Sequence, residues 1–119
     1  MDERFPKQRR IRKRPEFLQV QGCGRKAHSR FFVGLFLPGA GGATRMGVTT
    51  TRRIGPAVTR NRVKRIVREA FRRGGMMLPR GIDIVIVARE AASESESRLL
   101  FDDLTTLGRR VRKMTESDP

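Results

Sequence analysis

The chain has 119 residues, the usual size of one domain, with 27 Lys and Arg against 12 Asp and Glu and a formal net charge of +15. Such an excess of positive charge repels itself unless a polyanion relieves it, which leaves nucleic acid, an anionic membrane surface or an acidic protein as partners. Arginine outnumbers lysine 22 to 5, and because guanidinium binds phosphate through two hydrogen bonds and stacks on bases, the composition favours nucleic acid.

The cysteine content and the apolar runs bear on the location of the protein. Cys23 is the only cysteine, so no internal disulfide can form, and a reducing compartment is the simplest interpretation. No apolar run approaches the ~20 residues that a membrane-spanning helix needs, and the N-terminus lacks a hydrophobic signal core. The sequence therefore predicts a cytoplasmic protein with no membrane partner, and nothing in it requires a protein oligomer.

A basic arm and a short helix are predicted at the N-terminus. Seven of the first fourteen residues are basic and show no apolar periodicity, which is typical of an arm over residues 1–14 that is held loosely until it meets its partner. Pro15 suits the start of a helix that contains Phe17, and Gly22 and Gly24 would end it. We expect a single domain over residues 15–113 and a tail over residues 114–119.

Several segments have the composition of β-strands. Residues 30–37 are rich in aromatic and β-branched side chains and stop at Pro38. Residues 44–51 predict another strand, which the short glycine-rich loop between the two would place antiparallel to the first. Residues 82–88 are almost continuously β-branched, which is typical of a central strand. Residues 25–29 could add a short strand ahead of these.

Two helices with a clear apolar face complete the pattern. Pro56 and Gly74 suit the two ends of one helix, whose apolar stripe consists of Val63, Ile66, Val67, Ala70 and Phe71. Ser93 and Glu96 have the spacing of a capping box for the other helix, whose buried face would hold Leu100, Leu104, Leu107 and Val111. The expected order is helix, two or three strands, helix, strand and helix, an α/β fold.

No group of residues is arranged for catalysis by the protein itself. His28 is the only histidine, and a lone histidine before a strand is more often structural or exposed than a general base. Cys23 has no second cysteine with which to bind zinc. The carboxylates are scattered, and Asp102 and Asp103 are adjacent on a helix, where neighbouring side chains point about 100° apart. We therefore expect no catalytic residue and no direct metal ligand in this chain.

A basic face of one sign is predicted on the helix that follows Pro56. Residues 52–73 hold nine Lys and Arg and one acid, Glu69. On a helical projection the residues opposite the apolar stripe are Asn61, Arg65, Arg68 and Arg72, with Lys64 at one border and Arg62 on the other flank. Neighbouring cations on such a face are about 5–6 Å apart, comparable to successive phosphates. A solvated face usually carries both signs, so this pattern favours binding of a nucleic-acid backbone.

The same stretch resembles the signature of a known family. Residues 52–72, RRIGPAVTRNRVKRIVREAFR, closely resemble that of the bacterial ribonuclease P protein subunit, with Arg60-Asn61-Arg62 at its centre. The early helix with Phe17 and the strands follow in the family's order over about residues 9–113. The resemblance implies a two-layer α/β (α+β) sandwich with a mixed sheet, similar to the second domain of ribosomal protein S5, and a left-handed βαβ crossover against the usual preference.

The resemblance also implies a function and its residues. The protein would be a subunit of an endoribonuclease, paired with a catalytic RNA that removes the 5′ leader of precursor tRNA with Mg²⁺ ions held mainly by the RNA. The positions that match the RNA-binding motif are Arg52, Arg53, Arg60, Asn61, Arg62, Lys64, Arg65 and Arg68, to which the projection adds Arg72; Arg60 and Asn61 would lie nearest the metal ions.

A cleft for the leader is implied as well. Phe17 matches an aromatic position of its wall, and Val33 and Leu35 match its floor. Gln21 stands where a second aromatic residue is common, and Leu35 replaces a frequent aromatic residue. Base stacking contributes about 1–3 kcal/mol per base, so leader binding here would depend more on apolar contact and charge.

Two other classes of protein fit part of the pattern. A structural RNA-binding protein, such as a ribosomal protein, would have the same charge and a related fold but would not affect cleavage. A helix-turn-helix DNA reader is disfavoured, because a glycine-rich break and a strand follow the basic helix instead of a second helix.

Overall fold

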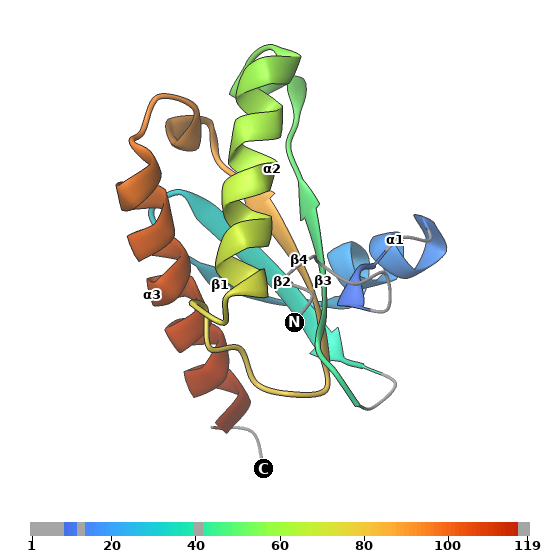
Figure 1. Ribbon diagram of the computed structural model, residues 1–119. Coiled ribbons are helices and arrows are strands. Elements are labelled where there is room, and N and C mark those ends of the chain that lie inside the picture. The colour runs from blue at the N-terminus through green and yellow to red at the C-terminus, as the bar shows by residue number, and fades with distance from the viewer. Residues whose placement is uncertain (1–8, 12–13, 40–41, 117–119) are drawn as a thin grey trace.

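A computed structural model describes residues 9–11, 14–39 and 42–116 (Figure 1). The elements in chain order are α1 (Arg14–Cys23), β1 (Arg25–His28), β2 (Phe32–Pro38), β3 (Arg45–Thr49), α2 (Ala57–Arg72), β4 (Ile82–Ala88) and α3 (Ser97–Glu116), with 3-10 turns η2 (Arg52–Ile54) before α2 and η3 (Glu90–Ser93) before α3. This order confirms the predicted succession of elements and the α+β class. Most of the predicted arm and the end of the predicted tail lie outside the described residues.

The four strands form one mixed sheet in the order β1-β2-β4-β3. β2 pairs antiparallel with both β1 and β4, and β3 pairs parallel with β4. Residues 30–37 and 44–51 therefore run in opposite directions, as predicted, but they are not neighbours in the sheet. β4 lies between them because it is apolar on both faces, with Ile84, Val85 and Ile86 each 0% exposed, and such a strand belongs in the centre of a sheet.

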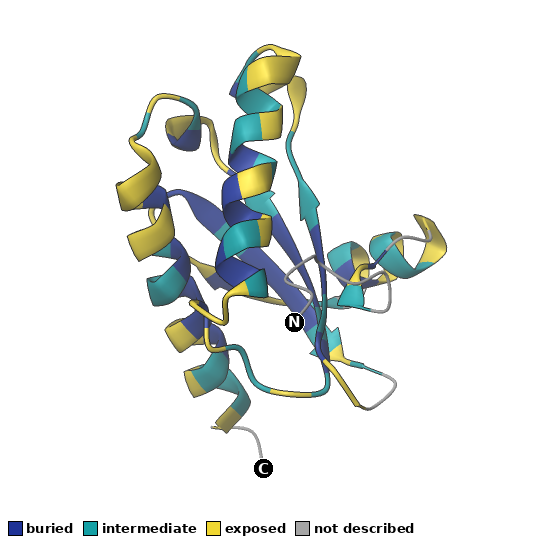
Figure 2. Ribbon diagram, viewed as in Figure 1, coloured by how far each residue is buried: buried dark blue, intermediate teal, exposed yellow. Residues whose placement is uncertain are grey.

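The two faces of the sheet are covered by different helices. α2 and α3 lie side by side on one face and α1 lies on the other (Figure 1). Alternation along β2 directs Phe32 and Phe36 into the larger core under α2 and α3, and Leu35 into a smaller core under α1. Both predicted helix stripes are buried in the larger core (Figure 2). No helix in the described part of the chain has both the length and the apolar composition of a membrane span.

The connection from β3 through α2 to β4 joins two parallel neighbours. It is thus a βαβ crossover, as the family resemblance implies. The left hand of that crossover stays a prediction.

α3 begins later than its capping-box pattern predicts. Ser93 ends η3, where its hydroxyl donates to the carbonyl of Glu90 at 2.8 Å, and the helix starts at Ser97. Ala92, which is 0% exposed, anchors the 3-10 turn in the core and delays the helix. The capping-box assignment was therefore wrong, because burial of this turn outweighs the local motif.

Asp103 ties α3 to the turn between β1 and β2. Its carboxylate accepts hydrogen bonds from the Ser29 hydroxyl at 2.6 Å, the Phe31 N–H at 2.9 Å and the Arg30 N–H at 3.1 Å. Without Asp103 the N–H groups of Arg30 and Phe31 would lose this acceptor, whereas the Ser29 hydroxyl could still donate to the carbonyl of Phe32 at 3.2 Å. One carboxylate thus fixes the edge of the sheet to the last helix.

We expect Asp103→Ala to lower the free energy of unfolding by about 2 kcal/mol, because hydrogen bonds to a charged acceptor are lost together. Denaturant unfolding monitored by circular dichroism measures this change. Asp102→Ala is the matched control, since it removes the same charge from an exposed neighbouring position. Equal destabilisation by both variants would contradict the role assigned to Asp103.

Candidate nucleic-acid interface

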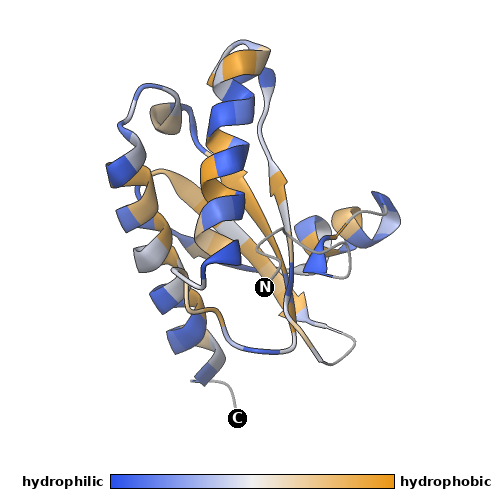
Figure 3. Cartoon of the chain, in the orientation of Figure 1, coloured by the Kyte–Doolittle hydropathy of each residue, from blue (hydrophilic) through white to orange (hydrophobic). Residues whose placement is uncertain are grey.

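α2 has one side in the core and one side in solvent. Val63 and Val67 are fully buried, and Ile66 is 5% exposed. The side turned away from the sheet is hydrophilic (Figure 3). Its exposed residues are Asn61, Arg65 and Arg68, which we call the outer face of α2. The predicted apolar stripe and the exposure of these three residues are confirmed.

Among the described residues, no acid forms an ion pair with the arginines on and beside the outer face. Arg65 and Arg68, and Arg52 and Arg53 in η2, form no ion pair with any described residue. The one acid of the helix, Glu69, is held by Arg72 at 2.6 Å and by Arg73 at 3.1 Å at the C-terminal end. The hydrogen bond from Arg72 lowers the pKa of Glu69. Arg72 therefore neutralises an internal acid, which sets it apart from the other predicted RNA-binding residues.

The three residues at the centre of the motif have different environments. Asn61 is exposed, whereas Arg62 donates to the carbonyl of Ser95 at 2.6 Å and to the Ser97 hydroxyl at 3.3 Å. The Nε of Arg60 is buried and has no hydrogen-bond partner within the described residues. Arg60-Asn61-Arg62 therefore does not present three equivalent polar groups to solvent.

The unpaired N–H groups of α2 precede this motif. The N–H of Arg60 already donates to the carbonyl of Pro56 at 3.0 Å. Only the N–H groups of residues 57–59 lie ahead of that first bond, and Val58 among them is 81% exposed. Any attraction of the helix end for phosphate thus acts at residues 57–59, just ahead of Arg60-Asn61-Arg62.

α1 brings the predicted wall and floor residues of the cleft together. Phe17 and Val33 pack against the small core that contains Leu35. Leu35 is 8% exposed beneath α1, so it packs under the floor of the predicted cleft and forms little of its surface. A Cβ at Gly47 would lie 2.6 Å from Cε2 of Phe17, so glycine at this position of β3 is what allows the ring to lie on the strand.

A partly open strip of sheet lies beside α1. The register places His28, Val33, Val87 and Thr49 in one row across the four strands, and each is exposed or half-buried. Gln21 follows Glu16 by five residues, which puts the two on opposite borders of α1. Glu16 contacts Arg45, and the rows of Arg45 and of Val33 lie on opposite sides of the row that contains Leu35. Gln21 therefore lies on the side of α1 that faces this strip.

The aromatic wall and the outer face of α2 meet at a shared cavity. It has a volume of about 270 Å³, and Phe17 and Arg68 both line it, together with Arg10 and the β3 backbone around Gly47. Sequence reasoning missed Arg10, which lies inside the predicted arm. Ile11 is 5% exposed, and its N–H donates to the carbonyl of Met46. Residues 9–11 are therefore held on the sheet, unlike the loosely held arm that was predicted for residues 1–14. The one signal in the sequence that this segment is held on the sheet is Ile11, a single isoleucine within a basic run.

An ion-pair cluster fixes α1 to the sheet. Arg45 on β3 donates to both carboxylate oxygens of Asp83, at 3.0 and 2.7 Å, and to Glu16 of α1 at 2.7 Å. These hydrogen bonds, that of Asp83 first, raise the pKa of Arg45 above its usual value. Two carboxylates that the sequence left scattered are thus joined by one guanidinium, which sets where α1 lies above β3.

The donor set of the interface does not suit a directly bound Mg²⁺ ion. Mg²⁺ requires oxygen ligands, usually including a carboxylate, whereas the exposed groups here are guanidinium and one amide, that of Asn61. No group of three or more His, Cys, Asp or Glu residues that could hold a metal occurs in the ranges that the structure describes.

His28 is exposed, and its Nδ1 lies 3.0 Å from Arg89.

Comparisons with known proteins identify the family. The model of the family described as Ribonuclease P matches residues 5–112. The ribonuclease P protein component of Desulfatibacillum aliphaticivorans is 42% identical over 107 residues, covering 90% of this chain and 91% of the relative. The chain belongs to the ribonuclease P protein family.

Solved structures of this family share the fold. The ribonuclease P protein of Thermotoga maritima superposes with a TM-score of 0.75 at 33% identity, covering 84% of this chain and 96% of that one. The Staphylococcus aureus protein gives a TM-score of 0.78 at 25% identity, covering 85% of this chain and 93% of that one. Membership of the ribonuclease P protein family supports a role as the protein component of an endoribonuclease in tRNA processing.

The different environments of Arg62 and Arg65 lead to a test of stability. We expect Arg62→Ala to lower the free energy of unfolding by about 1 kcal/mol, because the carbonyl of Ser95 loses its donor. Arg65→Ala should change it by less than about 0.5 kcal/mol, since Arg65 is exposed. Thermal and urea unfolding of the two variants measure the difference, and equal stabilities would show that the Arg62 contact is not formed in solution.

Proposed function

We propose that this chain is the protein subunit of ribonuclease P and binds both the catalytic RNA and the 5′ leader of precursor tRNA. In this role it aids the Mg²⁺-dependent hydrolysis that produces the mature 5′ end. A cytoplasmic location, which the single cysteine favours, is part of the proposal. The protein contributes affinity and position, and the catalytic groups belong to the RNA.

The observation that carries this proposal is the unneutralised outer face of α2. Arg65 and Arg68 project from a helix whose opposite side is locked in the core, so their positions are set before any partner arrives. Cations spaced about 5–6 Å apart along a helix suit the phosphates of a nucleic-acid backbone. Arg52 and Arg53 extend this surface beyond the N-terminal end of α2.

Arg60 supplies a second argument. Its buried Nε lacks an acceptor in the described part of the chain, and an unsatisfied buried donor costs about 1–3 kcal/mol. A rotation of the Arg60 side chain that brought its Nε to a phosphate or ribose oxygen at this end of α2 would relieve that cost. The residue thus has more to gain from a partner than a fully solvated arginine has.

The geometry also connects the two proposed RNA contacts. The cavity shared by Phe17 and Arg68 lies between α1 and the outer face of α2. A single strand that entered along the strip at Val33 could meet the aromatic wall and then the cations. We propose that the leader follows this path while the catalytic RNA occupies the outer face of α2 and η2.

Mg²⁺ would be bound by RNA and would activate water and stabilise the leaving oxygen. The residues of this chain neutralise phosphate charge near that centre, which lowers the repulsion that Mg²⁺ must otherwise screen. Asn61 is the one uncharged polar residue of the outer face, and its amide can accept a hydrogen bond from metal-bound water. Lys64 is half-buried at the border of that face and adds charge.

Addition of the chain to its cognate catalytic RNA should lower the Mg²⁺ concentration needed for leader removal. The reason is that protein cations replace part of the counter-ion screening. The measurement is the cleavage rate of precursor tRNA across a Mg²⁺ titration, with and without the protein. Unchanged cleavage at low Mg²⁺, together with intact RNA binding, would favour a structural RNA-binding protein instead.

The triple variant Arg60, Asn61 and Arg62→Ala should bind the catalytic RNA more weakly. The slope of log K against log salt concentration should flatten by up to about 2, because two cations are removed. Filter binding at several salt concentrations measures both quantities. An unaltered slope would place the contact elsewhere on the molecule.

A matched control separates local contact from total charge. Arg109 and Arg112→Ala also removes two cations, in the C-terminal half of α3. We expect this double variant to keep most of the affinity and the slope of the unaltered chain. If it weakened binding as much as the triple variant, the effect would be one of net charge alone.

A further inference from the structure

A second basic cavity lies at the opposite end of α2 from Arg60-Asn61-Arg62. α2 has 16 residues, so its two ends are about 24 Å apart. The cavity has a volume of about 330 Å³, and its lining includes Arg9, Thr44, Phe71, Met76, Leu78 and Arg80. It is separate from the cavity that Phe17 and Arg68 line.

Arg9 is oriented by two contacts before any ligand binds. Its guanidinium carbon lies 4.9 Å from the centre of the Phe71 ring, and its Nε donates to the carbonyl of Thr44 at 3.2 Å. Within the described part of the chain its two terminal nitrogens have no acceptor. A planar group fixed in this way keeps the two donors that bind a phosphate in parallel, at little further cost in conformational entropy.

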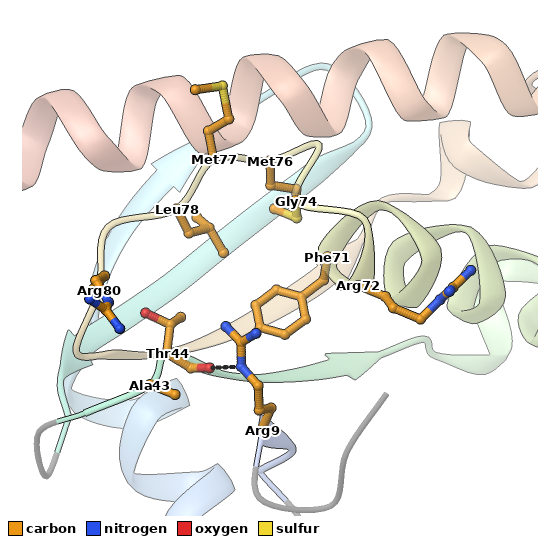
Figure 4. A pocket seen from close by; sticks show the side chains of 10 residues that line it. All are labelled: Arg9, Ala43, Thr44, Phe71, Arg72, Gly74, Met76, Met77, Leu78 and Arg80. Atoms are coloured by element: carbon orange, nitrogen blue, oxygen red, sulfur yellow. Dashed lines mark hydrogen bonds between the residues drawn. The ribbon is translucent and has the colours of Figure 1, made fainter. Parts of the chain in front are cut away.

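Arg80 faces the same space from the other side. Figure 4 shows the guanidinium groups of Arg9 and Arg80 on either side of Thr44, with Leu78 above them. Arg80 is exposed and forms no ion pair among the described residues. Arg72 also lines the cavity, but its side chain extends away along α2 toward Glu69.

The walls of the cavity combine positive charge with apolar surface. Leu78, which is half-buried, lies opposite the two arginines, and Met76, which is 1% exposed, belongs to the core behind it (Figure 4). A volume of about 330 Å³ falls within the range of ~300–1,000 Å³ that small-molecule sites have. No acidic residue is among those that line it. These features suit a ligand that is anionic at one end and flat and apolar at the other.

We propose that this cavity binds one unpaired nucleotide of an RNA strand. Arg9 and Arg80 hold the phosphate, and the base lies against Leu78 or stacks on the face of the Arg9 guanidinium opposite Phe71. RNA is favoured over an anionic lipid surface because a cavity of about 330 Å³ has the size of a small-molecule site and not of a broad, flat contact. The identity of the strand rests on the proposed function, but the chemistry of the cavity does not.

The experiment titrates the full chain with 5′-AMP, with inorganic phosphate and with adenosine, and follows amide chemical shifts by NMR. We expect 5′-AMP to shift the amides of Thr44, Leu78 and Arg80 saturably and at lower concentration than either fragment. Arg80→Ala should weaken 5′-AMP binding by roughly tenfold, the effect of one lost charge-assisted hydrogen bond. Arg98→Ala, an exposed cation at the start of α3, is the matched control and should leave binding unchanged.

Several outcomes would overturn the proposal. They are the absence of saturable shifts at these amides, equal shifts from inorganic phosphate, and equal losses in Arg80→Ala and Arg98→Ala. The triple variant at residues 60–62 should still bind 5′-AMP in the cavity. Loss of catalytic-RNA binding in that variant with 5′-AMP binding retained separates this site from the proposed function, and either can fail without the other.

Discussion

The buried stripe of α2 is the constraint on which the rest of the interface depends. Val63, Ile66, Val67, Ala70 and Phe71 lie in the core that α2 and α3 share with the sheet. Burial of such side chains contributes about 1.5–3 kcal/mol each for the larger ones, which prevents the helix from rotating to bring its arginines nearer to carboxylates. The outer face therefore keeps its charge exposed to solvent.

The second constraint is the fixed position of α1. Arg45 holds Glu16 and Asp83 together, and Gly47 allows the Phe17 ring to lie directly on β3. The first turn of α1 thereby lies beside Arg68, so an aromatic side chain and a cation without an ion pair among the described residues border one cavity. Aromatic stacking and phosphate pairing act on different parts of one nucleotide, and their proximity here results from packing between three elements.

Much of the fold and of the site could be predicted from local patterns, but some of it could not. The stripes of α2 and α3 and the strand at residues 82–88 followed from periodicity and composition. The opposite directions of residues 30–37 and 44–51 were predicted from the short loop between them. The position of β4 between these strands was not predicted, because burial on both faces decides which strand is central. The capping box at Ser93 was wrong because Ala92 is anchored in the core. Arg62 was assigned to RNA, yet one of its nitrogens contacts Ser95.

The sequence by itself determined the charge, the amphipathic character of α2 and the family, since these depend on residue types at short and regular spacing. Only the tertiary structure decided which arginines remain available. Arg72 is turned to Glu69 and Arg62 to Ser95, whereas Arg65 and Arg68 stay exposed, and Arg9 is placed over Phe71. Arg62 and Ser95, like Arg9 and Phe71, lie far apart along the chain and meet only when the helices pack on the sheet. Residue spacing carries no information about such contacts.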